Sequence, residues 1–260
     1  MRNIAIPFCF CIFLTFISFH PAGVVDYKID KIVIDPGHGG KDPGTSGSYT
    51  REKNISLKIS LELARIIKEN IPDVEVILTR DDDTYSHPAV RANLANEHAA
   101  DLFISIHANA SPSPSVYGTE TYVMGVKNIE RNFEVAKREN SVIMLEEDYE
   151  EKYGGFDPES PASYMIFTLT QNAFQDRSIR LAQLIEEQFE KRVGRRSLGV
   201  KQSSLWVLWN TAMPSVLVEV GYLSNAKEEK DLNDPLNQVY IASGIFRAFR
   251  DYKKEIESMN

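Results

Sequence analysis

The chain has 260 residues, of which 43% are hydrophobic and 25% are charged, and its formal net charge at pH 7 is −8. This composition is typical of a globular protein with one large domain, or with one domain that carries an insertion. A net-acidic chain without a basic run is a poor candidate for binding nucleic acid, so we expect no nucleic acid among its partners.

The N-terminal segment has the pattern of a secretory signal peptide. Arg2 precedes an almost wholly apolar run over residues 4–19, which is short for a membrane span of roughly 20 apolar residues. We expect residues 1–22 to be cleaved and no stable membrane span to remain; a retained N-terminal anchor is the alternative. Both cysteines, Cys9 and Cys11, lie in this segment, so the mature protein has no thiol for a disulfide, a nucleophile or a metal ligand.

Short apolar and β-branched runs alternate along the chain with segments of helical periodicity. The runs expected to form strands cover residues 31–35, 74–79, 101–106, 118–124 and 215–220. The segments expected to form helices cover residues 52–71, 88–99, 162–193 and 238–253. This alternation predicts an α/β sandwich with a largely parallel sheet, in a catalytic domain that spans residues 30–254.

Four side chains with metal or acid–base chemistry stand where α/β folds hold their ligands, at the carboxyl ends of strands. Three of them, His38, His107 and Glu219, follow or end expected strands, and Glu52 begins the first helix. Two imidazoles and a carboxylate form a catalytic zinc set that leaves one position for water, and a second carboxylate can then move the proton. We therefore expect His38, Glu52 and His107 to hold one Zn²⁺. Glu219 is expected to act as general base and acid.

Each of these residues also has an ordinary structural explanation. A loop histidine such as His38 is more often solvated than bound to metal, and Glu52 could be a first-turn charge favoured by the helix dipole. His107 and Glu219 lie within apolar runs, where burial of a group without a partner is costly. A shared site explains all four residues at once.

Several motifs, in order along the chain, resemble those of the zinc-dependent N-acetylmuramoyl-L-alanine amidases. They lie at residues 34–44 (IDPGHGGKDPG), 52–54, 78–80, 91–96, 101–109, 118–121, 207–208 and 213–225. The resemblance implies a three-layer sandwich with a mixed, mostly parallel six-stranded sheet flanked by helices. It implies the same zinc ligands, with Glu219 as the catalytic residue. The implied substrate is the amide between N-acetylmuramic acid and L-alanine in peptidoglycan.

The segment at about residues 126–175 resembles the regulatory insert of the cell-division amidases of Gram-negative bacteria. The similarity includes the Arg-Glu-Asn sequence at 138–140 and the acidic run after it. In those amidases a helix covers the active site until an activator with a degenerate LytM domain displaces it. We expect the same control here, with Glu146, Glu147 or Asp148 in the vacant zinc position; a solvated charged loop is the alternative.

The signal-peptide pattern predicts a secreted protein, and the resemblance implies a Gram-negative periplasm and a role in cell-wall remodelling or daughter-cell separation. The sequence leaves two other functions open. A zinc carboxypeptidase acting on stem peptides would need an arginine for the terminal carboxylate, and Arg80 or Arg91 could serve. A non-catalytic peptidoglycan-binding regulator would keep the fold and lose the chemistry.

Overall fold

A computed structural model describes residues 28–125, 127, 129–167 and 174–259. The expected signal peptide at residues 1–22 lies outside the described residues. Within the described ranges, no helix is both long enough and apolar enough to cross a membrane.

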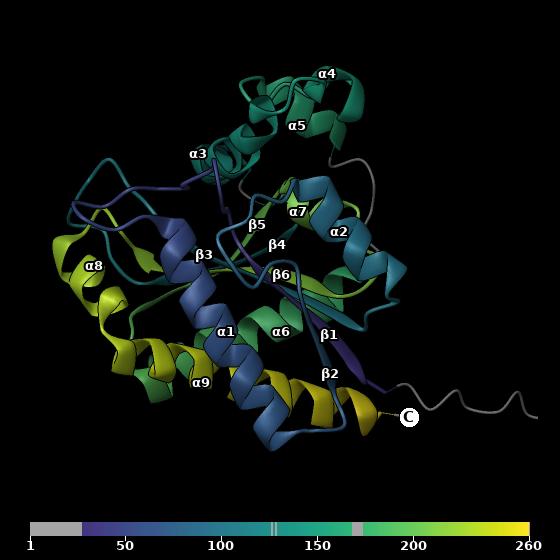
Figure 1. Cartoon of the computed structure of the whole chain (residues 1–260), viewed down its shortest axis with the longest axis vertical. Coiled ribbons are helices and arrows are strands. Elements are labelled where there is room, and N and C mark those ends of the chain that lie inside the picture. The colour runs from purple at the N-terminus through teal and green to yellow at the C-terminus, as the bar shows by residue number, and fades with distance from the viewer. Residues whose placement is uncertain (1–27, 126, 128, 168–173, 260) are drawn as a thin grey trace, which may run out of the picture.

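A six-stranded sheet forms the centre of the fold (Figure 1). In spatial order its strands are β2 (Glu75–Leu78), β1 (Lys31–Pro36), β3 (Leu102–Asn109), β6 (Ser215–Tyr222), β4 (Thr119–Met124) and β5 (Ser197–Ser203). Strands β2, β1, β3 and β6 run parallel, whereas β4 pairs antiparallel with β6 and parallel with β5. The predicted mixed, mostly parallel sheet of six strands is confirmed.

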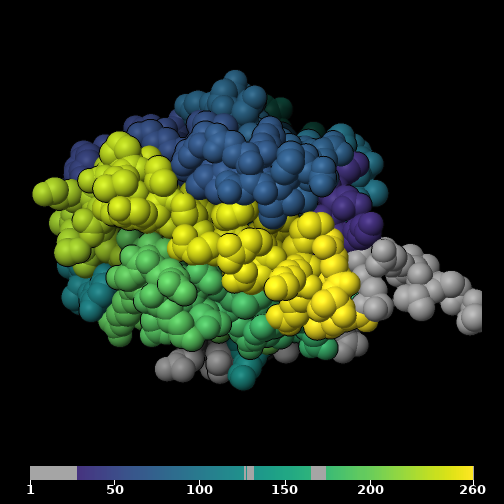
Figure 2. Space-filling model, turned by 90° about the horizontal axis from the view of Figure 1, so that it is seen from below, coloured from purple at the N-terminus to yellow at the C-terminus, as the bar shows by residue number. Residues whose placement is uncertain are grey.

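Helices cover both faces of the sheet and complete a three-layer sandwich. One face is covered by α1 (Glu52–Asn70), α6 (Gln175–Gln188) and α9 (Pro235–Glu257), which lie side by side in Figure 2. The other face carries α2 (Pro88–Glu97), α7 (Trp206–Trp209) and the insert helices α3 (Ile129–Asn140), α4 (Tyr149–Lys152) and α5 (Pro161–Phe167). Among the described residues, the other helical elements are α8 (Ala226–Asn233), the 3₁₀ helix η1 (Ser141–Leu145) and the π-helix η2 (Phe189–Val193).

The central strands are buried on both faces, which explains their nearly continuous apolar sequences. Ile32 and Ile34 of β1 point into the core shared with α1 and α9. Val33 points the opposite way and belongs, with Phe103 of β3, to a second core that includes α7 and the insert. Residues that alternate along one strand therefore support two separate helical layers.

The segment at 162–193, expected to form one long helix, is divided in the structure. Helix α5 ends at Phe167 and α6 begins at Gln175. Tyr164 of α5 packs in the core on the insert side, whereas Leu181 of α6 packs in the core on the opposite face of the sheet. The prediction of a single helix was wrong because the two halves of this segment serve different layers.

Strand β5 was not among the expected strands. It lies at the edge of the sheet and is only half-buried along most of its length. Its sequence includes Gly199 and Lys201 and lacks the apolar run that marks the central strands. An edge strand of this kind gives a weak periodic signal.

Candidate active site

The loop after β1 carries His38 into the site, and two buried arginines fix its main chain. Arg80 donates hydrogen bonds to the carbonyl oxygens of Pro36 and Gly37 at 2.9 and 2.7 Å. Arg91 donates to those of Pro36 and His38, each at 2.7 Å. His38 itself has a φ of 61°, a left-handed conformation that a residue with a side chain keeps only where its surroundings impose it. The arginines therefore position the imidazole.

The buried carboxylate of Asp35 supports the position of Arg91, which holds this loop. Asp35 accepts a hydrogen bond from Arg91 at 2.7 Å and another from the Ser105 hydroxyl at 2.6 Å. Burial disfavours its charged form, but the guanidinium of Arg91 and the hydroxyl donors lower the pKa of Asp35 below its ordinary value. Because Arg80 and Arg91 are both buried and directed at the main chain, the structure contradicts a role for either in gripping a substrate carboxylate.

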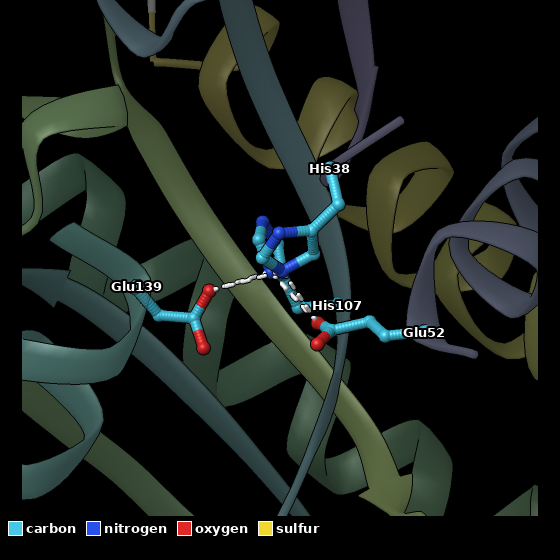
Figure 3. A group of neighbouring side chains, drawn as sticks. All are labelled: His38, Glu52, His107 and Glu139. Atoms are coloured by element: carbon cyan, nitrogen blue, oxygen red, sulfur yellow. Dashed lines mark hydrogen bonds and ion pairs between the residues drawn. The ribbon is translucent and has the colours of Figure 1, made fainter. Parts of the chain in front are cut away.

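Four buried side chains converge at the carboxyl edge of the sheet, and Glu139 reaches the histidines from the side opposite Glu52 (Figure 3). The Nε2 atom of His38 lies 3.1 Å from Glu52 Oε1 and 3.4 Å from Glu139 Oε2. The Nδ1 atom of His107 lies 3.0 and 2.9 Å from the same two oxygens. A Cβ atom at Gly37 would collide with the ring of His107, so only glycine fits there.

Four of the distances between these donor atoms are compatible with a tetrahedral metal ion, and all the donor atoms lie within 4.8 Å of one another. With metal–ligand bonds of about 2.0–2.1 Å, the ligand atoms of a zinc site lie about 3.3 Å apart, close to the four separations above. The Nδ1 atom of His38 is 2.7 Å from Asp42 Oδ2, and its Nε2 has no hydrogen-bond partner among the described residues. A carboxylate behind the ring is the usual support of a metal-binding imidazole, and it leaves the Nε2 lone pair for the ion.

The two carboxylates of the cluster require positive charge nearby. Burial disfavours the protonated histidines, but Glu52 and Glu139 raise the pKa of His38 well above its ordinary value and that of His107 to about 9. Burial likewise opposes ionisation of Glu52, yet His38 and His107 lower its pKa to about 2. Two protons or one divalent cation can supply the charge, and a cation would displace the protons.

Glu219 lies beside this cluster on the neighbouring strand, because the parallel register of β3 and β6 pairs it with His107. It is fully buried, and neither carboxylate oxygen has a hydrogen-bond partner among the described residues. Burial raises the pKa of Glu219 well above its ordinary value, and the negative charges of Glu139 and Glu52 raise it further. A carboxyl group with a raised pKa is suited to accept and return a proton near neutral pH.

The insert contributes Glu139 to the cluster, and the three acidic residues expected there lie elsewhere. Glu147 and Asp148 are exposed, and Glu146 is buried outside the group of metal-binding side chains. The acidic run stands out in the sequence by its density of charge, whereas Glu139 is a single carboxylate near the end of α3. The sequence signal that could have identified Glu139 is its place between Arg138 and Asn140, because a buried carboxylate needs a charged or hydrogen-bonding partner.

Glu146 anchors the insert to the catalytic domain instead. It accepts hydrogen bonds from Tyr153 at 2.6 Å and from Lys152 at 3.1 Å, and its Oε1 lies 2.5 Å from Nδ1 of His87. Nearby, Lys41 of the loop after β1 donates to the carbonyl of Leu145 at 2.8 Å. The acidic run thus attaches the insert beside the site without entering it.

An α/β sandwich with two histidines, two carboxylates and an adjacent buried glutamate at the carboxyl edge of its sheet defines a candidate metal-dependent hydrolase. Residues 32–251 match the model of the N-acetylmuramoyl-L-alanine amidase family, and the chain belongs to this family.

Relatives and solved structures agree with this assignment. The N-acetylmuramoyl-L-alanine amidase AmiC of Escherichia coli O6:H1 is 28% identical over 226 residues, which cover 85% of this chain and 52% of that protein. The crystal structure of an N-acetylmuramoyl-L-alanine amidase from Clostridium difficile 630 has a TM-score of 0.66 and 28% identity, covering 87% of this chain and 97% of that one. The CwlD amidase from Clostridioides difficile, solved in complex with the GerS lipoprotein, has a TM-score of 0.63 and 26% identity, covering 86% and 98%.

Proposed function

We propose that this protein is a zinc-dependent N-acetylmuramoyl-L-alanine amidase, which hydrolyses the amide between N-acetylmuramic acid and the L-alanine of the peptidoglycan stem peptide. Membership of the family over residues 32–251 supports the reaction. The convergence of two imidazole nitrogens and two carboxylate oxygens within 4.8 Å of one another supports the metal. The observation that carries the proposal is the register of His107 with Glu219, because it sets a proton-transfer group beside the cluster.

The side chains divide the work between metal binding and proton transfer. His38, Glu52 and His107 would hold one Zn²⁺, which when bound supplies a water of lowered pKa and a positive charge for the substrate carbonyl. Glu219 accepts a proton from the attacking water and passes it to the nitrogen of the leaving amine. The stem peptide then departs with a free amino end.

We infer further that α3 holds the enzyme inactive. The Glu139 carboxylate takes the fourth donor position, which hydrolysis needs for water. The preceding residue, Arg138, places Nη2 3.6 Å from Oε1 of Glu219 and donates to Asn109 Oδ1 at 2.8 Å. Two consecutive residues of one helix therefore obstruct both the metal and the general base.

Asn140, the last residue of α3, fixes the end of this helix to the catalytic domain. Its Nδ2 donates to the carbonyl of Ser204 at 2.8 Å, and its Oδ1 accepts from the backbone N–H of Trp206 at 2.9 Å. The side-chain amide thus pairs with both a main-chain acceptor and a main-chain donor. This arrangement supports a defined closed state, and α3 would leave the site as a unit when that state opens.

Opening this state requires a partner that binds the insert or its docking surface. The resemblance of the insert to that of the cell-division amidases favours an activator with a LytM-type domain, and a related amidase has been solved with a lipoprotein partner. We propose that the mature protein acts outside the cytoplasm, in a Gram-negative periplasm. Its role there would be cell-wall remodelling or daughter-cell separation.

The role of Glu219 is tested with Glu219→Gln, made in the unmodified chain and in a Glu139→Ala background. We expect kcat on purified peptidoglycan to fall by about 10²-fold or more, while bound zinc, measured by atomic emission, is unchanged. Glu147→Gln, at an exposed position of the insert, is the matched control. Wild-type turnover of Glu219→Gln in the open background would overturn the assignment.

A further inference from the structure

We propose that a second buried carboxylate, Glu120, binds the amino end of the leaving peptide, and that the cavity in front of it receives the rest of that peptide. This inference rests on the proposed function. The cavity has a volume of about 1020 Å³, and residues of α3, of α6 and of the strands β4 and β5 line it. Its walls include Glu120, Tyr222, Asn109 and Lys201.

The sheet register places Glu120 next to the catalytic residues. His107 on β3 pairs with Glu219 on β6, and Glu219 pairs with Glu120 on β4. Directly opposed residues of neighbouring strands project from the same face of a sheet, and adjacent strands lie about 4.8 Å apart. The three side chains therefore form a row that runs from the metal cluster to the general base and on to Glu120.

This row gives the substrate a direction. The carbonyl carbon must lie at the cluster, and the leaving nitrogen must lie within reach of Glu219, which protonates it. The leaving chain therefore continues past Glu219 toward β4 and β5, where the cavity begins. The glycan side of the bond lies on the opposite side, toward β1.

The surroundings of Glu120 suit a positively charged or N–H donor group. Only 8% of the residue is exposed, and its Oε2 accepts from the Tyr122 hydroxyl at 2.7 Å and from Asn109 Nδ2 at 3.2 Å. A cation already stands here, because Arg138 lines the same cavity and donates to Asn109 Oδ1 at 2.8 Å. The guanidinium of α3 thus occupies the region in which the new amino end would form.

Lys201, on the wall of the cavity formed by β5, supplies a positive charge opposite in sign to the Glu120 carboxylate. Lys201 on β5 pairs in register with Tyr122 on β4, so it projects from the face that carries Glu120. An ammonium at this position suits the carboxylates of a peptide whose amino end lies at Glu120. The cavity therefore has the polarity of a peptide that enters amino end first.

The test is calorimetric binding of the synthetic tetrapeptide L-Ala-γ-D-Glu-L-Lys-D-Ala, with a free or an acetylated amino end. It uses the full chain and its Arg138→Ala variant, which should bind more tightly because the competing guanidinium is gone. In both, we expect Glu120→Gln to weaken binding of the free peptide about tenfold. Acetylation of the amino end should lower the binding affinity by a similar factor when Glu120 is present, and by at most about twofold when Glu120 is replaced. Glu134→Gln, an exposed carboxylate at the rim of the same cavity, should bind as its parent does.

The two ligands make the test independent of the stability of the variants, because acetylation alters only the peptide. The proposal would be overturned if acetylation lowered the affinity equally in the protein with Glu120 and in the Glu120→Gln variant. The amidase reaction is tested separately, by digestion of peptidoglycan with the opened Glu139→Ala variant. If peptidoglycan is digested but the predicted binding pattern is not seen, only the peptide site is wrong. If the binding pattern is seen but peptidoglycan is not digested, only the proposed reaction is wrong.

Discussion

Glu139 places one carboxylate oxygen 2.9 Å from Nδ1 of His107, which joins the insert helix α3 to the end of the central strand β3. The same oxygen lies 3.4 Å from Nε2 of His38. A donor atom in this position completes a tetrahedral set and leaves no site for a reacting water. In the function proposed above, this contact makes the closed and the catalytic states mutually exclusive.

Glu139→Ala should raise the basal rate of peptidoglycan hydrolysis by about tenfold or more. Breaking a buried ion pair by removing one partner costs about 3–5 kcal/mol, so loss of the contacts of Glu139 with His38 and His107 favours the open state. The measurement is release of soluble fragments from purified peptidoglycan by the zinc-loaded protein. Glu147→Ala, in the same insert but exposed, should leave the basal rate unchanged. An unchanged rate for Glu139→Ala would show that this side chain does not restrain the enzyme.

Asp42→Ala should weaken zinc binding by about 10–100-fold, because Asp42 holds the ring of His38 through its Nδ1 at 2.7 Å. Competition with a chromophoric chelator gives the dissociation constant. The control is Asp81→Ala, at an exposed position of a nearby loop. Equal affinity in the two variants would remove the supporting role of Asp42.

Zinc uptake near pH 7 should release about two protons, one from each histidine of the cluster. Nearby carboxylates outweigh burial and raise the pKa of His38 well above its ordinary value and that of His107 to about 9, so both rings are protonated in the metal-free protein. Zinc affinity should consequently increase as pH rises toward about 9. Calorimetry in buffers of different ionisation enthalpy counts the protons. Uptake without proton release would show that the histidines are neutral beforehand.

Asp35→Asn should destabilise the fold by about 3–5 kcal/mol at neutral pH, because it leaves the buried Arg91 guanidinium without its charged partner. Burial opposes ionisation of Asp35, but Arg91 and the hydroxyl donors lower its folded-state pKa. Its contribution is therefore complete above the unfolded-state pKa of about 3.9 and is lost as pH falls through the lower folded value.

Urea unfolding of both proteins between pH 7 and pH 3 measures this difference. The gap between them should be constant from pH 7 to about pH 5 and should narrow below about pH 4. A gap that widens on acidification would mean that Asp35 is protonated in the native state.

The sequence predicted the parts of the site that follow buried strands. His107 and Glu219 stand out because each is polar inside an apolar run, and the strand signal also fixes which edge of the sheet they reach. Their approach to one another depends on the strand order β3-β6, in which distant segments become neighbours. No periodicity contains that order, and the family resemblance implied only a mixed, mostly parallel sheet of six strands.

Local sequence alone does not distinguish Glu139 from the other acidic residues of the insert as a member of the site. Glu139 belongs to an ordinary charged helix, and its burial depends on how the insert packs, with Asn140 held by main-chain groups near Trp206. The acidic run that begins at Glu146 carries more charge. Burial of the Glu146 carboxylate is explained by its contacts with His87, Tyr153 and Lys152. Charge density is visible in a sequence, whereas the partner that makes a buried carboxylate tolerable is not.

The most direct test of the central claim is digestion of purified peptidoglycan by the zinc-loaded Glu139→Ala protein, with the products identified by mass spectrometry. We expect intact stem peptides that begin with a free L-alanine amine, together with glycan that has lost them. Chelation, or the additional change Glu219→Gln, should abolish both products. Release of single terminal amino acids, or no release from this opened variant, would contradict the assignment as an amidase.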